Sequence, residues 1–291
     1  MKKYLLLALS FLSLVLISCD KKSDNLNNKT GDIPQGDKIE LSVVEKYYLP
    51  IVNVSKDDSN AFKNELHKLV EQSHTKRLTY KEVWTALETA DQDPNNKNNI
   101  LCFYSGQSIL KSKHVGSEGK TGEWNREHLY PQSNGFKQKW NGDYLPAHND
   151  IFHVRATEYT TNSSRGDDPF GEGGLFYTPR PEIRGDIARA LFYMTVRYEA
   201  DDYTSYTYNG KTYDDLDDLD LELASGDTKP FSGQYYVNDL ACLIKWFYED
   251  PVSEEEKERN EKVFNIQGNR NPFIDHPEYL KILYPELTAN Y

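Results

Sequence analysis

Two short blocks in the middle of the chain combine residue types that can perform acid–base and metal chemistry. Residues 123–131 (EWNREHLYP) set the carboxylate of Glu127 directly beside the imidazole of His128, and residues 150–165 (DIFHVRATEYTTNSSR) carry Asn162 near their end. Carboxylate and amide oxygens are hard ligands suited to Mg²⁺ or Ca²⁺, and a neutral histidine beside such a cation can take a proton from water. The alternative is purely structural, with a surface Glu–His ion pair and an asparagine in a turn.

The two blocks need a particular order of elements to bring these side chains together. Pro131 ends the first block, and Ile151 to Val154 form a short β-like run followed by a polar stretch that reaches Asn162. A strand, a connection, a second strand and a short helix would place Glu127, His128 and Asn162 side by side. The spacing therefore predicts a small strand–strand–helix unit.

The rest of the chain shows mostly helical periodicity. Phe62, Leu66, Leu69 and Val70 form one face of an amphipathic helix. Similar patterns predict helices at 79–87, where Thr79 and Glu82 have capping-box spacing, and at 187–198 and 236–247, whereas 99–105 is predicted to be a strand. With no internal repeat or interior linker, the sequence indicates one α+β domain over residues 41–291.

Composition excludes several classes of protein. The 291 residues are 37% hydrophobic and 13% aromatic, which rules out a disordered chain, a collagen-like fibre and a multi-span membrane protein. The net charge of −12 argues against a nucleic-acid partner, but residues 199–227 alone contribute −9. We interpret that segment as a solvated loop, with a calcium site as the alternative.

Outside this acidic segment, basic residues gather around the two blocks. These are Lys111, Lys113, Lys120, Arg126, Lys137, Lys139, Arg155 and Arg165. They predict one basic face that binds nucleic acid and loses affinity as salt rises.

The N-terminus has the pattern of an export signal. Lys2 and Lys3 precede an apolar run, and Leu16-Ile17-Ser18-Cys19 resembles the bacterial lipobox. We expect a lipoprotein signal peptide at 1–18, lipidation of Cys19 and a flexible tether at 19–40, with an ordinary signal peptide as the alternative. This predicts a protein of the bacterial cell envelope, lipid-anchored to the outer membrane or cell surface.

The other two cysteines, Cys102 and Cys242, lie in apolar patterns. We interpret both as buried small residues rather than as a disulfide. No zinc-ligand spacing is present.

Several long motifs, in order, resemble the bacterial endonuclease I family, whose members are extracellular and periplasmic nucleases of the ββα-metal (His-Me finger) class. They are residues 124–131, 150–165, 185–190, 194–199 and 267–277, and the similarity spans roughly 45–285. The departures are Phe152 in place of a polar residue, Arg155-Ala156 in place of an apolar-Pro pair, and Gly166-Asp167 in place of Ser-Asn. Glu127, His128 and Asn162 are retained.

The resemblance implies a mostly helical single domain around a ββα-metal core with a small sheet. It assigns Glu127 and Asn162 to one divalent cation, Mg²⁺ with Mn²⁺ or Ca²⁺ as alternatives, and His128 to the general base. Arg165 is the first candidate to clamp a phosphate and Arg126 the second.

The same resemblance implies a monomer that hydrolyses phosphodiester bonds of DNA, with RNA as a second possible substrate, leaving 5′-phosphate and 3′-hydroxyl ends. No base-reading motif is apparent, so we expect little sequence specificity. His153 fits either a packed structural role or a role in orienting the site.

Two other functions remain open from the sequence. One is a surface lipoprotein that binds glycan or protein through its tyrosines and acidic segment, with a vestigial nuclease site. The other is a phosphodiesterase that acts on a non-nucleic substrate with the same metal site.

Overall fold

The computed structural model describes most of the chain from residue 41 onward. The described residues are 41–131, 139–140, 143–174, 176–199, 206–208, 211–213, 223 and 239–291. The predicted signal peptide, Cys19 and the tether lie outside these ranges, as does most of the acidic segment 199–227. Within the ranges, no helix combines the length and the apolar character needed to cross a bilayer.

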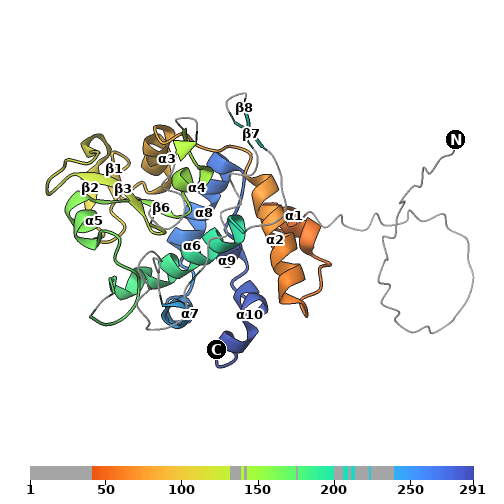
Figure 1. Cartoon of the computed structure of the whole chain (residues 1–291). Helices are drawn as coiled ribbons and strands as arrows, with labels where there is room; N and C mark the ends of the chain where they lie inside the picture. Colours follow the sequence, from red (N-terminus) through yellow and green to blue (C-terminus); the bar gives the residue numbers. More distant parts are fainter. Residues whose placement is uncertain are drawn as a thin grey trace, which may run out of the picture. The chain divides into compact units, whose positions relative to one another are not determined.

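Helices make up much of the described chain (Figure 1). They are α1 (Val43–Tyr48), α2 (Ser59–Ser73), α3 (Glu82–Ala90), α4 (Pro146–Asn149), α5 (Tyr159–Arg165), α6 (Arg184–Arg197), α7 (Leu240–Glu249), α8 (Glu254–Gln267), α9 (Pro272–Asp275), α10 (Tyr279–Leu283) and α11 (Pro285–Thr288). Short 3₁₀ turns are η1 (Leu49–Ile51), η2 (Lys111–Lys113) and η4 (Pro181–Ile183).

The strands form small antiparallel pairs. They are β1 (Asn99–Leu101) with β2 (Ser108–Leu110), β3 (Trp124–His128) with β6 (Val154–Glu158), β4 (Lys139–Trp140) with β5 (Asp143–Tyr144), and β7 (Tyr206–Tyr208) with β8 (Lys211–Tyr213). Helices beside small two-stranded sheets confirm the α+β class.

The first helices follow their sequence signals. Asp58 caps α2 by accepting a hydrogen bond from the Ala61 amide at 3.0 Å. On the predicted apolar face of α2, Phe62, Leu66 and Val70 are buried and Leu69 is half-buried against the core. Ahead of α3, the Thr79 amide donates to the Glu82 carboxylate at 2.8 Å and the Glu82 amide donates back to the Thr79 hydroxyl at 3.2 Å. The capping box predicted from spacing is therefore confirmed.

Helix α6 forms the centre of the core. Every residue from Ile187 to Arg197 is buried, and the helix packs against α2, α7 and α9. This agrees with the predicted helix at 187–198. In α7, Leu243 and Phe247 are buried on the predicted face, whereas Tyr236 of the same pattern lies outside the described residues.

The predicted strand at 99–105 is wrong beyond Leu101. The Gly106 amide donates to the Cys102 carbonyl at 2.8 Å, and Gly106 has a φ of +71°, so the chain turns back at once into β2. The turn buries Tyr104 and directs it toward β3. Cys102 and Cys242 are both buried and free, which confirms the expectation that they do not pair.

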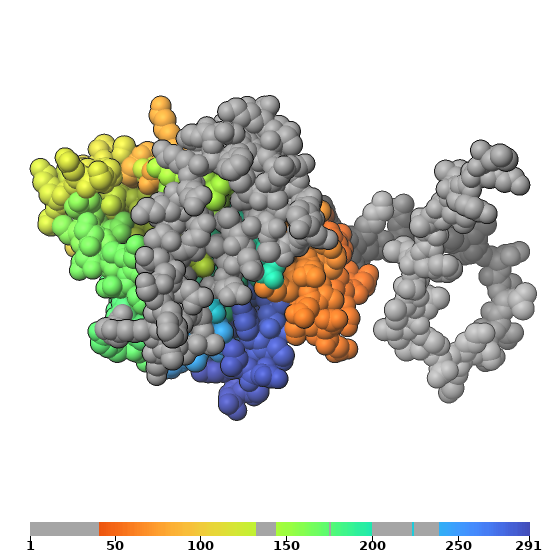
Figure 2. Space-filling view, viewed as in Figure 1, coloured from red at the N-terminus to blue at the C-terminus, as the bar shows by residue number. Residues whose placement is uncertain are grey.

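Strands β3 and β6 and helix α5 form a continuous strand–strand–helix unit. Trp124 lies opposite Glu158 and His128 opposite Val154, and α5 follows β6 directly and packs on both strands. In Figure 1 this unit lies with β1 and β2 at the opposite end of the domain from α1 and α2. Figure 2 shows the same two ends as separate yellow–green and orange surfaces.

Candidate active site

The end of β3 brings the first two predicted site residues to the edge of the strand–strand–helix unit. Successive side chains on a strand point to opposite faces, so Glu127 points toward α5 while His128 points toward α4 and the loop after it. Both side chains are buried. The unit thus gives a carboxylate and an imidazole that are adjacent in sequence but held by different neighbours.

Two side chains hold the Glu127 carboxylate, and the backbone amide of His128 also donates to it. The Tyr104 hydroxyl donates to Oε1 at 2.5 Å and Nη1 of Arg165 donates to the same oxygen at 3.1 Å, so Oε2 carries neither bond. Burial raises the pKa of Glu127, although the Arg165 charge and the Tyr104 hydrogen bond act in the opposite direction. The carboxylate is fixed in place with one oxygen outside the two side-chain bonds.

His128 has a defined tautomer in this setting. Its Nε2 lies 2.9 Å from the carbonyl oxygen of His148, and because a carbonyl only accepts, Nε2 must carry the proton. Nδ1 of the neutral ring is then the acceptor, and no hydrogen bond to it is found among the described residues. Burial, together with the neighbouring His148 and His153, lowers the pKa of His128 well below its ordinary value of 6.5. The ring is therefore neutral at pH 7 and able to accept a proton.

Asn162 lies on α5 and is tied back to β3. Its Nδ2 donates to Oδ1 of Asn125 at 2.9 Å and to the carbonyl oxygen of Arg126 at 3.3 Å. These bonds fix which amide atom faces the strand and leave Oδ1 as the acceptor. The structure thus brings Asn162 and Glu127 to the same strand–helix unit, as the spacing predicted.

The donor atoms of Glu127 and Asn162 fit a hard divalent cation. Oε2 of Glu127 accepts neither of the two side-chain bonds, and Oδ1 is the acceptor atom of the Asn162 amide; such oxygens are what Mg²⁺ and Ca²⁺ prefer. Among the described residues, no group of three or more His, Cys, Asp or Glu side chains could hold a metal. A cation bound here would be coordinated by few protein atoms and by several waters, as Mg²⁺ usually is in proteins.

Arg165 occupies the interior of the unit rather than its surface. The residue is 2% exposed, and besides Glu127 it donates to the carbonyl oxygens of His128 at 3.2 Å and Leu129 at 3.3 Å. Its guanidinium carbon also lies 4.6 Å from the centre of the Phe170 ring. These contacts join α5 to the end of β3. The phosphate clamp expected at this position stays a prediction.

Arg126 lies on the same face of β3 as His128 and is half-buried between aromatic rings. Its guanidinium carbon is 3.2 Å from the centre of the Tyr80 ring and 3.9 Å from that of Trp84, and Nη1 donates to the Tyr80 carbonyl. Burial lowers the pKa of Arg126 to about 10. The structure therefore shows Arg126 in a cation–π stack beside the site.

His153 is fully buried behind His128. Its Nε2 donates to the Ala147 carbonyl at 2.6 Å, and its ring centre lies 5.6 Å from that of His128. Burial lowers its pKa to about 4. This packing corresponds to the structural role, and through Ala147 it supports the helix α4 whose carbonyl holds His128.

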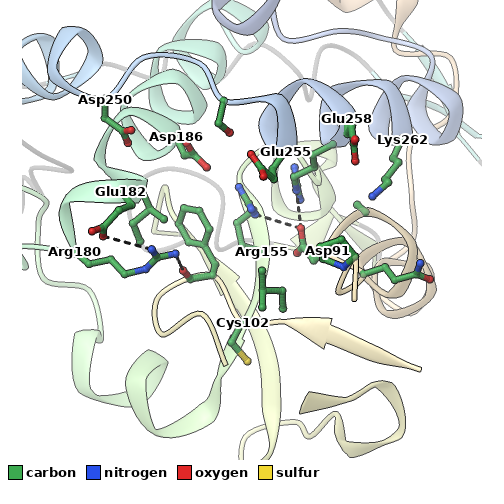
Figure 3. Close-up of a pocket in the computed structure, with 18 residues that line it drawn as sticks. Asp91, Cys102, Arg155, Arg180, Glu182, Asp186, Asp250, Glu255, Glu258 and Lys262 are labelled. Carbon is green, nitrogen blue, oxygen red and sulfur yellow. Dashed lines mark hydrogen bonds and ion pairs between the residues drawn. The ribbon is translucent and has the colours of Figure 1, made fainter. Parts of the chain in front are cut away.

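The predicted basic face is wrong for Arg155 and Arg165, because both are paired with buried carboxylates. Arg155 lies 3.4 Å from Asp91 beside a cavity of about 440 Å³ between β6 and α8, where Figure 3 shows it directed toward Asp91. Arg259 pairs with Asp91 at 2.6 Å in the same cavity, and Arg165 is paired with Glu127. Buried carboxylates neutralise these guanidiniums because an unpaired buried charge is costly. Lys137 and the Lys139 side chain lie outside what the structure describes.

Sequence reasoning missed Tyr104 and His148. Tyr104 follows an apolar run and carries no local signal, since its role depends on the turn at Gly106. His148 lies two residues before the second block, in a Pro-Ala-His-Asn segment whose helix-starting proline was a usable signal. It contributes a backbone carbonyl, which no residue type can reveal.

Comparisons with known proteins identify the family of this chain. Residues 58–178 and 173–278 match the family described as Endonuclease I. The extracellular ribonuclease of Bacillus amyloliquefaciens is 39% identical over 249 residues, covering 81% of this chain and 76% of the relative. The extracellular ribonuclease of Bacillus subtilis (strain 168) is 36% identical over 241 residues, covering 78% and 75%.

The family match includes both blocks, and the aligned relatives span most of the chain. The site residues Glu127, His128 and Asn162 all fall inside the matched region. The chain therefore belongs to the endonuclease I family and is a nuclease.

Proposed function

We propose that this chain is an exported nuclease that hydrolyses phosphodiester bonds of RNA and DNA with little sequence specificity, using one divalent cation and His128 as general base. The observation that carries the proposal is the fixed ring of His128, whose Nε2 donates to the His148 carbonyl at 2.9 Å. A general base needs a neutral ring whose acceptor nitrogen can meet water. This bond keeps the proton on Nε2 and leaves Nδ1 as the acceptor, and burial keeps the ring neutral.

The reaction we propose is hydrolysis at phosphorus. A water oxygen attacks in line, its proton passes to Nδ1 of His128, the P–O3′ bond breaks, and the 3′ oxygen is protonated from solvent. The products carry 5′-phosphate and 3′-hydroxyl ends. A divalent cation held by Glu127 and Asn162 supplies Lewis-acid stabilisation of the negative charge that develops.

In this proposal, Arg165 and Tyr104 are positioning residues. They donate to one oxygen of Glu127 and leave the other outside their bonds. Arg165 also donates to the two carbonyls that follow β3, which fixes His128 and Glu127 relative to α5. This role accounts for the burial of Arg165 better than a phosphate clamp does, because a clamp needs contact with the substrate.

RNA is the first substrate we propose and DNA the second. Both curated relatives are named extracellular ribonucleases, which favours RNA over the DNA expected from the family resemblance. Contacts to phosphate carry no sequence information in themselves, so the low specificity expected from the sequence stays part of the proposal.

Nuclease assays with defined metals test the proposal. Purified protein should cut RNA and plasmid DNA with Mg²⁺, Mn²⁺ or Ca²⁺, lose this activity in EDTA, and leave ends that a 5′-phosphate-dependent exonuclease accepts. Intact RNA and DNA under all three metals would overturn the nuclease activity proposed here. Cyclic or 3′-phosphate ends would contradict the proposed cleavage of the P–O3′ bond but not the nuclease activity.

The export part of the proposal rests on the N-terminal sequence and on the names of the relatives. We propose that residues 1–18 are removed and that Cys19 carries a lipid. The variant Cys19→Ala should move the protein from the membrane fraction of expressing bacteria to the soluble one. An unchanged membrane fraction in Cys19→Ala would contradict the anchor and leave the nuclease proposal untouched.

A further inference from the structure

We propose that a column of stacked side chains beside His128, formed by His114, Trp84, Arg126 and Tyr80, is a nucleobase-stacking platform for single-stranded nucleic acid. We refer to these four residues as the aromatic column. The inference rests on the proposed nuclease function and extends it by naming the form of substrate that the site accepts.

The column is continuous from the surface to the catalytic histidine. The ring of His114 lies on that of Trp84 with centres 4.5 Å apart and planes 29° apart. Arg126 joins Trp84 to Tyr80 at 3.9 and 3.2 Å from the two ring centres. The centre of the Tyr80 ring lies 6.3 Å from that of His128.

Strand β3 holds the column in place. Trp124, Arg126 and His128 alternate with Asn125 and Glu127, so they share one face of the strand. Nε1 of the buried Trp124 donates to the carbonyls of Leu110 and Lys111 at 3.2 and 3.1 Å, which fixes the turn η2 that leads into His114. The strand that positions the general base therefore also positions the stack.

The outer end of the column is open to a ligand. His114 is exposed, while Trp84, Arg126 and Tyr80 are half-buried. One face of the His114 ring lies on Trp84, so a second aromatic ring can stack on the other face. Nucleobases stack on such rings without sequence preference because every base has a π-face.

The charge around the column suits a phosphate backbone. Lys113 directly precedes His114, and Lys81 directly follows Tyr80; both are exposed, and no ion pair involves either of them among the described residues. The carboxylate of Glu82, the residue after Lys81, accepts a hydrogen bond from the Thr79 hydroxyl and lies 3.8 Å from the Lys76 ammonium. Exposed cations flanking an aromatic stack are the usual composition of a single-strand binding surface. Duplex bases are already stacked on one another, so a duplex cannot use the platform.

A pair of oligonucleotides separates base stacking from phosphate binding. One is a short labelled single strand, and the other is the same backbone with abasic sites. Binding is measured by fluorescence anisotropy in the His128→Ala background so that the strand stays intact. We expect the base-bearing strand to bind at least about fivefold more tightly than the abasic one, and more tightly than its duplex.

Three variants assign the preference to the column. His114→Ala should remove most of the preference for bases, and His114→Phe should keep it, because the ring and not the charge is required. Lys113→Ala is the matched control and should weaken binding of both strands alike, with a smaller dependence on salt.

The outcomes separate this proposal from the nuclease proposal. Equal affinity for the two strands, or a full preference for bases in His114→Ala, would overturn the platform even where the wild-type protein cuts RNA. A clear preference for bases in a protein that cuts neither RNA nor DNA would support the platform and overturn the nuclease activity.

Discussion

Two clusters of polar residues in this protein come from equally strong motifs but have opposite properties. The first is the site at Glu127, His128 and Asn162. The second lies around Asp150, where the second block meets the motif at 267–277, and we refer to Asp150, Tyr193, Tyr198, Gln267 and Asn269 as the Asp150 network. Both clusters combine ionisable and amide side chains, and all of these side chains are buried except that of Asn162, which is half-buried.

The two clusters differ in how completely their hydrogen bonds are made. Each oxygen of Asp150 accepts two bonds: Oδ1 from the Phe152 amide and Gln267, and Oδ2 from the hydroxyls of Tyr193 and Tyr198 at 2.6 and 3.0 Å. At the site, by contrast, both side-chain bonds to Glu127 fall on Oε1, and the hydrogen bond of the His128 ring falls on Nε2. A satisfied network fixes the fold, whereas acceptors outside such bonds can meet a cation or a water.

Removing the imidazole of His128 should have the largest effect on activity. We expect His128→Ala to lower kcat by about 10²- to 10⁴-fold, because a positioned general base contributes that much. The melting temperature should fall as well, because the buried ring packs against His148 and His153 and its removal leaves a cavity, so activity is compared per folded molecule. The measurement is single-turnover cleavage of a labelled strand together with thermal unfolding.

A histidine outside the site provides the control for this variant. His276 stacks on Tyr279 and lies 3.0 Å from Glu278, far along the chain from the site. His276→Asn should retain the activity of the wild type. Retention of most activity in His128→Ala would remove the distinction between the two clusters.

Breaking the ion pair inside the site should have the largest effect on stability. Arg165→Met leaves the buried carboxylate of Glu127 without its cation, and we expect a loss of about 3–5 kcal/mol in the free energy of unfolding. Chemical denaturation measures this loss. Adding Glu127→Gln should recover part of it, because the uncompensated charge is then gone. No recovery would show that the packing of Arg165, and not its charge, supports the site.

A change in the Asp150 network should affect stability and spare the chemistry. Asp150→Asn replaces one oxygen with an amide that cannot accept the bonds of Tyr193 and Tyr198 or of Gln267. We expect a loss of about 1.5–3 kcal/mol in the free energy of unfolding, because the bonds lost are to a charged group. The kcat of the folded variant should fall far less than that of His128→Ala. A catalytic loss equal to that of His128→Ala would place the Asp150 network in the active site.

The smallest predicted effect is a pH dependence of the contribution that Asp150 makes to the free energy of unfolding. Burial acts to raise the pKa of Asp150, but His74, the Tyr193 hydroxyl, the Phe152 amide and Gln267 together outweigh it and hold the pKa below 3.8. A group whose pKa is depressed on folding stabilises the protein above its unfolded pKa of about 4, and this stability is lost as pH falls through the folded pKa. The difference in unfolding free energy between wild type and Asp150→Asn should therefore shrink below about pH 4. A constant difference down to pH 3 would contradict the assigned direction.

Much of the fold was predictable because its signals are local. The apolar face of α2, the capping box before α3 and the buried helix α6 all follow from the spacing of neighbouring residues. The strand predicted at 99–105 failed because its apolar run was read without the glycine that reverses it. Helix α8 was not predicted at all, since its charged sequence has no apolar stripe.

The sequence alone determined the chemical groups of this protein and the order in which they occur: a carboxylate beside an imidazole on one strand, an asparagine on the following helix, and motifs of one nuclease family around them. Only the tertiary structure decided what each group can do. It paired Arg155 and Arg165 with buried carboxylates, fixed the proton of His128 through the carbonyl of His148, and brought Tyr104 to Glu127. The reason is physical, because burial, tautomer and the availability of an acceptor depend on partners that folding brings from elsewhere in the chain.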